Sequence, residues 1–152
     1  MNRRTLMTAT MILSVSFGLA QMAIAETPAS DAKASLKKYF RAWGEPDSQT
    51  RETLLANAWA EKGTYTDPTA HVEGRDALVK HIAEFLSNPQ FKNTSLMQTS
   101  DIDIHHRSFR FEWTMKDASG AAMVSGMDYG EMNEDGKITK IVGFFGPFPE
   151  LK

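Results

Sequence analysis

The sequence predicts an α+β domain, because its helical and strand-like stretches are separated along the chain. Apolar residues recur every three or four positions between residues 31 and 87, and they alternate with other residues between 93 and 145. The period changes after Asn88 and Pro89, a pair that ends a helix. We therefore expect three helices followed by a long antiparallel meander, with one short strand, 64–66, among the helices.

The three predicted helices have recognisable ends. A polar cap near residue 30 begins the first, and Gly44 ends it. The second begins at Asp47 or Ser48 and is expected to continue through Trp59 to a stop at Gly63, and the third covers 75–87. Their apolar stripes are Leu36, Tyr39, Phe40 and Trp43; Leu54, Leu55, Ala58 and Trp59; and Leu78, Val79, Ile82, Phe85 and Leu86.

Four strands are predicted after the third helix. Their ranges are 93–104, 108–115, 122–132 and 137–145. The turn from Asn133 to Gly136 is the strongest hairpin signal in the chain, with Gly136 in the left-handed conformation.

The later strands carry apolar residues on both faces. One face is formed by Phe109, Phe111 and Trp113 on one strand, and a face of the next strand carries Val124, Gly126, Asp128 and Gly130. The opposite face of that strand carries Met123, Met127 and Tyr129. Three helices can cover only one side of such a sheet. A homodimer is therefore expected, in which a second copy covers the other side.

The first 25 residues are expected to be a cleaved export signal. Arg3 and Arg4 precede an uncharged apolar run, and Ala23, Ile24 and Ala25 have the small-x-small form of a cleavage site. A membrane anchor is the alternative reading, but the run is short and no second span follows it. The two arginines also resemble a twin-arginine signal. We expect an exported bacterial protein, periplasmic or secreted, with a single mature domain, 26–152, and no membrane anchor after cleavage.

The composition excludes several classes of function. The chain has no cysteine and a net charge of −2, which becomes more negative when the two arginines of the signal are removed. Thiol chemistry and cysteine-bound metals are therefore excluded, and the acidic balance argues against a nucleic-acid partner. The sequence has no glycine-rich phosphate loop, nucleophile elbow or metal cluster, so we expect neither a cofactor nor a metal.

Four motifs together cover most of residues 31–146. They are KKYFRAW around Tyr39, the strand end TYTDP, the helix start GRDALVKHI and the hairpin MDYGEMNEDGKITKI. Together they resemble the nuclear transport factor 2-like superfamily, in particular its SnoaL-like polyketide cyclase and ketosteroid isomerase branch. The resemblance implies a cone of three helices packed on a strongly bent sheet that encloses a pocket, and it implies that dimers are common. Members include isomerases, cyclases, dehydratases, epoxide hydrolases and binding modules, so the fold does not settle the function.

The resemblance also assigns candidate catalytic roles to three residues. In ketosteroid isomerase an aspartate moves a proton, while a tyrosine and a protonated aspartic acid hold the oxyanion. Asp67 in TYTDP matches the base, and Tyr39 and Asp128 match the two donors. Asp67 before Pro68 is also an ordinary turn residue, and Tyr39 has the apolar spacing of its helix. Asp128 is harder to explain structurally, because a buried carboxylate is costly unless it is paired or protonated.

Further residues are expected to contact a ligand. They are Phe111, Trp113, Phe145, His71 and His106. The aromatic residues fit an apolar ligand, although a core would use them too. His71 follows Asp67 in a loop and is equally typical of the surface, while His106 reaches the pocket only if no bulge intervenes. His81 is expected on the polar side of its helix.

The alternation of Asp101, Asp103 and His105 along one strand could suggest metal ligands. Alternating polar residues opposite Ile102 and Ile104 are more typical of a solvated strand face, which is our interpretation.

Three functions fit the sequence. The first is an exported, cofactor-free acid–base enzyme of the isomerase, cyclase or dehydratase type, which acts on a small, largely apolar molecule. The second is a module of the same fold that binds such a molecule without turnover. The third is a dimer whose role is protein interaction.

Overall fold

A computed structural model describes residues 28–151. Its helices are α1 (Pro28–Gly44), α2 (Ser48–Ala58), α3 (Arg75–Ser87) and the short 3-10 helix η1 (Pro89–Phe91). Its strands are β1 (Trp59–Thr66), β2 (His71–Glu73), β3 (Ser95–Gln98), β4 (Asp103–His105), β5 (Ser108–Lys116), β6 (Ala122–Met132) and β7 (Ile138–Phe145).

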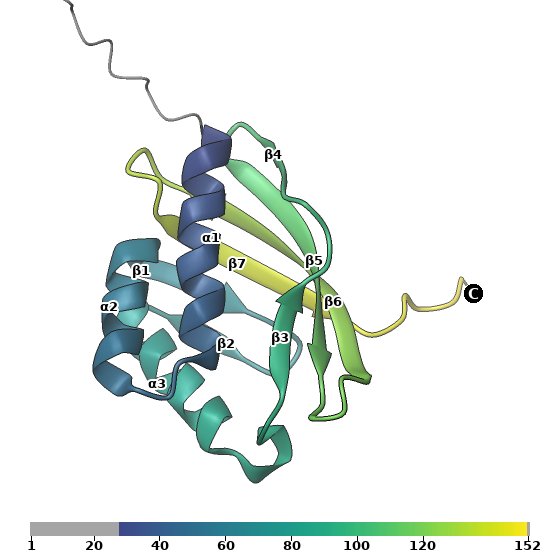
Figure 1. The fold of residues 1–152 in the computed structure, drawn as a ribbon. Helices are drawn as coiled ribbons and strands as arrows, with labels where there is room; N and C mark the ends of the chain where they lie inside the picture. The colour runs from purple at the N-terminus through teal and green to yellow at the C-terminus, as the bar shows by residue number, and fades with distance from the viewer. Residues whose placement is uncertain (1–27, 152) are drawn as a thin grey trace, which may run out of the picture.

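The strands form one mixed sheet in the order β2-β1-β7-β6-β5-β3, and β4 also pairs with β5 (Figure 1). Strands β1 and β7 run parallel, and the other pairs are antiparallel. The last strand therefore returns to lie beside the first, which brings the end of β1 next to the centre of the meander. The predicted class, three helices on a bent and mainly antiparallel sheet, is confirmed.

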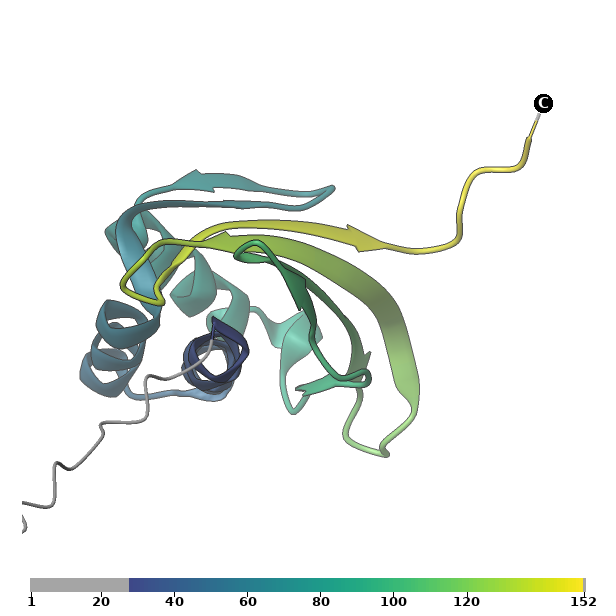
Figure 2. The ribbon, with the colours of Figure 1, turned by 90° about the horizontal axis from the view of Figure 1, so that it is seen from above.

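The sheet bends strongly and the helices lie on its concave side (Figure 2). We call this side the inner face. Gly126 on β6 lies opposite Trp113 on β5, and a Cβ at Gly126 would lie 2.6 Å from the indole ring and 2.5 Å from the carbonyl oxygen of Phe144. The ring thus lies directly across the glycine backbone, so any side chain at this position would force the strands apart.

Aromatic side chains of α1 pack against part of the inner face. Tyr39 stacks on Trp59 of β1 with ring centroids 5.7 Å apart, and Phe40 meets Phe111 of β5 edge-on at 5.3 Å. Buried aromatic rings contribute large apolar areas and favour such stacked and edge-to-face pairs. These contacts hold α1 against the sheet without any disulfide.

The prediction that the second helix continues to Gly63 is wrong. Helix α2 ends at Ala58, and Trp59 begins β1, where it pairs with Ile138 of β7. Trp59 is fully buried, and its ring lies where a Cβ of Gly63 would be, so glycine serves here to admit the indole into the sheet. An apolar residue at the end of a helical stripe also fits the first inward position of a strand, and periodicity does not separate the two.

The predicted strand 93–104 is interrupted. It divides into β3 and β4, which pair with different parts of β5. Between them, the Ser100 hydroxyl accepts the backbone N–H of Glu112 at 2.8 Å, and Thr99 N–H donates to the carbonyl oxygen of Glu112 at 2.8 Å. A side chain therefore replaces one bond of the ladder, and the chain bends at this point.

The predicted hairpin between β6 and β7 is confirmed. Gly136 has φ 69°, and the Asn133 side chain accepts backbone N–H groups from Asp135 and Lys137 at 3.1 and 2.9 Å. Strand β6 has the predicted bounds. Strand β2, which was not predicted, forms within the loop after Asp67 and pairs with β1.

The first 25 residues, which carry the predicted export signal, lie outside the described residues. In the part of the chain that is described, no helix is long and apolar enough to cross a membrane.

Candidate active site

Two carboxylates lie on the inner face on either side of Gly143. Strand β1 ends at Thr66 beside Val142 of β7, so Asp67 comes next to Gly143. Gly143 in turn pairs with Asp128 of β6. A Cβ at Gly143 would lie 2.9 Å from Asp128 Oδ1 and 3.6 Å from Asp67 Cβ. The parallel pairing of β1 and β7 therefore brings together two acids that are 61 positions apart in the sequence.

Asp67 lies at the rim, where its carboxylate is saturated with hydrogen bonds. Its Oδ1 accepts the backbone N–H groups of Thr69 and Ala70 at 2.6 and 2.7 Å and the Thr69 hydroxyl at 2.8 Å. Its Oδ2 accepts the Tyr65 hydroxyl at 2.7 Å. Partial burial acts to raise the pKa of Asp67, but these hydrogen bonds outweigh it and hold the pKa below its usual value.

Asp128 lies at the centre of the sheet with an exposed fraction of 6%. Its Oδ1 accepts the indole N–H of Trp113 at 2.7 Å. Burial raises the pKa of Asp128 to about 6, the Trp113 hydrogen bond acts against this, and the charge of Asp67 adds to it. Within the described residues Oδ2 has no hydrogen bond, so one oxygen of this carboxyl is free to exchange a proton.

Two tyrosines, Tyr39 and Tyr65, lie near the two carboxylates and complete the candidate site. Tyr39, predicted from the first helix, is 2% exposed, and burial followed by the charge of Asp128 raises its pKa well above the usual value. Tyr65 was missed by sequence reasoning, although it stands two residues before Asp67 and alternation turns it to the same face. Burial and the neighbouring Tyr39 raise the pKa of Tyr65 as well. Both phenols remain protonated donors at neutral pH.

His81 lies nearer to this group than predicted. Its ring is half-buried, 5.6 Å from the Tyr65 ring and 5.8 Å from the Trp43 ring. The prediction that it faces the polar side of α3 is wrong, and the spacing could have shown it, because His81 lies three residues after Leu78 and four before Phe85 on one helix face. Beside it, the indole N–H of Trp43 is buried without a hydrogen-bond partner among the described residues.

The three predicted aromatic ligand contacts lie on the inner face. Phe111 is 2% exposed and packs between Phe40 and Phe109, so it forms part of the core. Trp113 is half-buried and meets the half-buried Phe145 at 6.1 Å. Of these two rings, Trp113 contacts the carboxyl of Asp128, through its indole N–H.

The two predicted histidines lie elsewhere. His71 is exposed on β2 opposite Thr66, whose hydroxyl lies 2.7 Å from its Nδ1, and this pair faces away from Tyr65. His106 is exposed in the turn between β4 and β5, with φ 45°. This left-handed turn, rather than a continuing strand, directs His106 away from Asp128.

Two of the alternating polar residues, one before β4 and one in it, form ion pairs. Asp101 pairs with Lys33 at 2.9 Å, and Asp103 pairs with Arg110 at 2.8 Å. Within residues 28–151 no group of three metal-binding side chains is arranged around one point.

Comparison with known proteins identifies the family. The SnoaL-like domain family matches residues 36–141, which is most of the chain. The chain belongs to the SnoaL-like family, within the nuclear transport factor 2-like superfamily. A comparison with curated protein sequences gives no match.

Solved structures similar to this SnoaL-like chain have the same fold. A proposed isomerase of the SnoaL-like family from Agrobacterium tumefaciens is 27% identical, with a TM-score of 0.71 over 78% of this chain and 99% of that one. A proposed SnoaL-like polyketide cyclase from Jannaschia is 11% identical, with a TM-score of 0.63 over 81% and 91%. A nuclear transport factor 2-like protein of unknown function from Cytophaga hutchinsonii is 11% identical, with a TM-score of 0.57 over 76% and 90%.

The inner face of this SnoaL-like protein combines an acid that titrates near neutral pH with one that stays ionised. Two groups of the same type can take different roles when their surroundings separate their pKa values. Here the difference is between burial at Asp128 and hydrogen bonding at Asp67.

Proposed function

We propose that the inner face binds a small, largely apolar molecule that carries a carbonyl group, and that Asp128 exchanges a proton with it. The observation that supports this most is the buried Asp128 carboxyl, whose pKa is about 6 and whose Oδ2 has no hydrogen bond among the described residues. A group with this pKa is mostly ionised at neutral pH and still holds a proton well, which suits general acid–base catalysis.

The proposed step is an isomerisation. Asp128 takes a proton from the carbon beside the carbonyl, and the electron pair of that C–H bond moves to the carbonyl oxygen as an enolate. A phenol donates a hydrogen bond to the enolate oxygen: either Tyr39, or Tyr65 if it gives up its hydrogen bond to Asp67. When a C=C bond lies next to that carbon, the enolate extends over it, and Asp128 returns the proton to the far carbon of that bond. The carbonyl re-forms and the C=C bond moves into conjugation with it, so substrate and product have the same atoms and no cofactor is consumed.

This proposal differs from the sequence-based hypothesis in which Asp67 is the base. The oxygens of Asp67 already accept four hydrogen bonds, and its lowered pKa makes it a weaker base than Asp128. Burial is the main cause of the raised Asp128 pKa, and Asp67 instead supplies a fixed negative charge that raises it further. The proposed isomerase and cyclase functions of similar structures agree with this type of chemistry.

Proton exchange can be tested without the natural substrate. A small apolar cyclic ketone is incubated with the protein in deuterium oxide, and loss of its α-proton signals is followed by proton NMR. Asp128→Asn should slow the exchange by about a hundredfold or more. The matched control is Asp135→Asn, which removes an exposed carboxylate from the β6–β7 turn and should leave the rate unchanged.

The alternative is a binding module without catalysis. Its outcome in the same experiment is saturable line broadening of the ketone with no exchange above the buffer rate in any variant. That outcome would contradict the acid–base proposal and leave only ligand binding.

We also propose that two copies associate through the outer face of the sheet. Phe144 of β7 is 58% exposed there and Met123 of β6 is 46% exposed, and both alternate with inward-facing residues. Exposed large apolar side chains on neighbouring strands favour association. Sedimentation analysis should give a dimer for the wild type and a monomer for Phe144→Glu. A wild-type monomer at micromolar concentration would contradict the proposal.

We propose, finally, that the protein is exported. The basic start, the apolar run and the alanines at 23 and 25 support this. Amino-terminal sequencing of the protein from the cells that make it should begin at Glu26, and retention of residues 1–25 would contradict export.

A further inference from the structure

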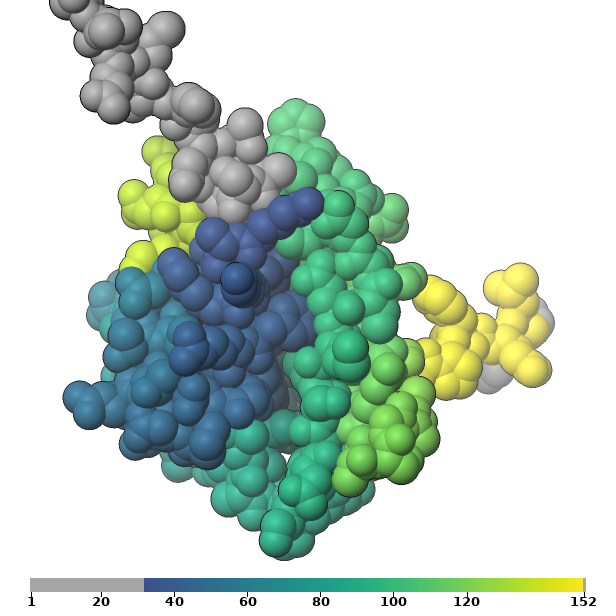
Figure 3. Space-filling view, viewed as in Figure 1, coloured from purple at the N-terminus to yellow at the C-terminus, as the bar shows by residue number. Residues whose placement is uncertain are grey.

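A groove of about 390 Å³ lies outside the carboxylate pair, between α1 and the chain that connects β3 to β4. Figure 3 shows the surface hollowed between the blue helix α1 and the green strand β3. The groove is lined by Lys33, Lys37, Phe40, Leu96, Gln98, Asp101 and Ile102. Its volume lies in the range of small-molecule sites.

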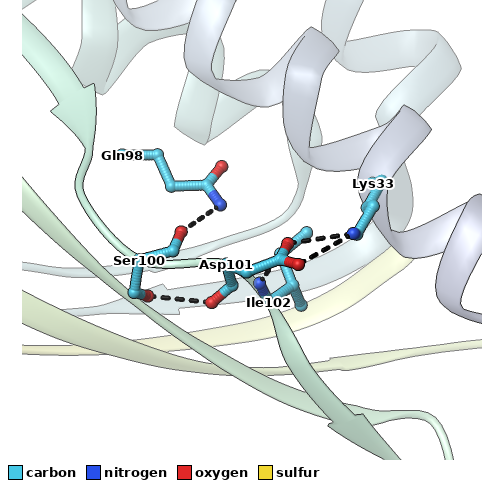
Figure 4. A network of polar contacts seen from close by, with 5 residues as sticks. All are labelled: Lys33, Gln98, Ser100, Asp101 and Ile102. Atoms are coloured by element: carbon cyan, nitrogen blue, oxygen red, sulfur yellow. Dashed lines mark hydrogen bonds and ion pairs between the residues drawn. The ribbon is translucent and has the colours of Figure 1, made fainter.

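The wall of the groove opposite α1 is held by its own hydrogen bonds (Figure 4). Gln98 Nε2 donates to the backbone oxygen of Ser100 at 2.7 Å, and the Ser100 hydroxyl donates to the backbone oxygen of Asp101 at 2.8 Å. Asp101 Oδ1 accepts the backbone N–H of Ile102 at 2.9 Å. The bend is therefore held by hydrogen bonds within the chain, which is the condition for a preorganised site.

One ion pair connects this wall to α1. Lys33 Nζ lies 2.9 and 3.1 Å from the two oxygens of Asp101 (Figure 4). The pair also neutralises the only carboxylate that lines the groove.

A second cation of the groove, Lys37, forms none of the ion pairs seen among the described side chains. Lys33, Lys37 and Arg41 follow one another at four-residue spacing on the same face of α1. Lys33 pairs with Asp101 and Arg41 with Glu45 at 3.7 Å, whereas Lys37 has no ion pair with the side chains described for residues 32–151. The groove thus carries one uncompensated positive charge beside an apolar floor.

The floor is formed by Phe40, Leu96 and Ile102, all partly buried against the core. Phe40 is also the residue whose ring meets Phe111 of the inner face. We propose that this groove binds an amphiphilic anion, whose apolar body lies on the three apolar side chains and whose carboxylate or sulfonate pairs with Lys37. The charge complementarity at Lys37 selects an anion over a neutral apolar molecule of the same size.

Two naphthalene probes test this inference directly. Anilinonaphthalene sulfonate carries the anionic group, and phenylnaphthylamine has nearly the same apolar body without it. Both are titrated by fluorescence into the wild type, Lys37→Gln and Lys38→Gln. Lys38 is exposed on α1 and does not line the groove, so its variant makes the same charge change on the same helix.

The sulfonate probe should bind Lys37→Gln about threefold to fivefold more weakly than the wild type, the size of one partly exposed ion pair. Its affinity for Lys38→Gln and the affinity of the neutral probe for all three proteins should be unchanged. In NMR spectra, the sulfonate probe should shift the amide signals of Leu96 and Ile102.

Equal weakening by Lys37→Gln and Lys38→Gln would show a general charge effect and overturn the inference. Unchanged sulfonate affinity in Lys37→Gln would overturn it as well, as would shifts confined to the residues around Asp128. Because no turnover is measured, a failed ketone exchange experiment does not affect this result, and the two proposals can fail separately.

Discussion

The rim turn that holds Asp67 and the strand centre that holds Asp128 shift the pKa of an aspartate side chain in opposite directions. At the rim, backbone and side-chain donors surround a partly exposed carboxylate and lower its pKa. At the strand centre, a buried carboxyl receives one indole N–H, and its pKa rises to about 6. Only Gly143 separates the two environments.

The comparison shows that local turn chemistry and burial can shift the pKa values of two neighbouring carboxyls in opposite directions. The rim acid is held in its charged state by the Tyr65 hydroxyl and by the Thr69 and Ala70 donors of an Asx-type turn. Burial of the central acid raises its pKa to about 6. The following predictions alter one side of this pair at a time, beginning with the residue between them.

The largest effect is expected from Gly143→Val. A Cβ at this position would lie 2.9 Å from Asp128 Oδ1, and the two methyl groups would press between the carboxylates. Overpacking of this kind should reduce the free energy of unfolding by about 3 kcal/mol, measured by urea denaturation. Gly44→Ala is the control, since nothing lies within 4 Å of its Cβ, and its change should stay within about 0.5 kcal/mol. Equal stability of Gly143→Val and wild type would mean that the two acids do not lie close together.

The second prediction concerns pH. Because the folded pKa of Asp128, about 6, lies above its ordinary value, the folded protein binds this proton more tightly than the unfolded chain. The resulting stability is complete below the ordinary pKa of aspartate and is lost as pH rises through about 6. Between about pH 5 and about pH 8 the wild type should lose about 1.4 kcal/mol relative to Asp128→Asn.

Two other aspartates, Asp67 and Asp135, serve as controls for this pH dependence of stability. The lowered pKa of Asp67 contributes stability that is lost only at more acidic pH, so it does not alter this window. Asp135→Asn should follow the wild-type curve. Parallel curves for the wild type and Asp128→Asn would contradict a raised Asp128 pKa.

The sequence allowed much of this arrangement to be predicted, because local patterns encode the elements. The β6 bounds, the hairpin at Gly136 and the shared face of Asp128 and Gly126 follow from alternation and turn residues, and the structure agrees. The cone and the three candidate catalytic residues followed from the family resemblance. Local patterns were sufficient wherever one element determines the outcome.

What failed depended on contacts between distant elements. Trp59 follows a helical stripe, and only its pairing with Ile138 makes it the start of a strand. Likewise, the bend after Gln98 depends on the hydrogen bond from the Glu112 backbone N–H to the Ser100 hydroxyl. No pattern of residue spacing in the sequence predicts this bond. The family resemblance implied the order of the two pKa values, with Asp128 as the protonated acid and Asp67 as the base. The donors that lower the Asp67 pKa and the burial that raises the Asp128 pKa could not be predicted from spacing.

The third prediction changes the single donor at the buried acid. In Trp113→Phe an aromatic ring still lies over Gly126, but the hydrogen bond to Asp128 Oδ1 is lost. This bond lowers the Asp128 pKa, so its loss should raise the midpoint above 6 by about one unit. Carbon-detected NMR titration of the aspartate carboxyls measures it. A lower midpoint would mean that water enters and that burial, rather than the indole, was lost.

The smallest effect is expected at the rim, from Tyr65→Phe. The variant removes the hydroxyl that donates to Asp67 Oδ2 at 2.7 Å, while the donors to Oδ1 from Thr69 and Ala70 remain. Loss of one hydrogen bond to a partly exposed carboxylate should cost about 1 kcal/mol in urea denaturation.

The same variant should raise the Asp67 pKa toward its ordinary value, because the Tyr65 hydrogen bond is the strongest of those that lower it. Tyr129→Phe is the matched control, since Tyr129 donates to Glu131 at 2.8 Å on the outer face, and it should leave the Asp67 titration unchanged. An unchanged Asp67 midpoint in Tyr65→Phe would show that the turn alone sets the charge of this acid. The phenol would then be available to a ligand at no cost to the rim, which would favour Tyr65 over Tyr39 as the donor to an enolate.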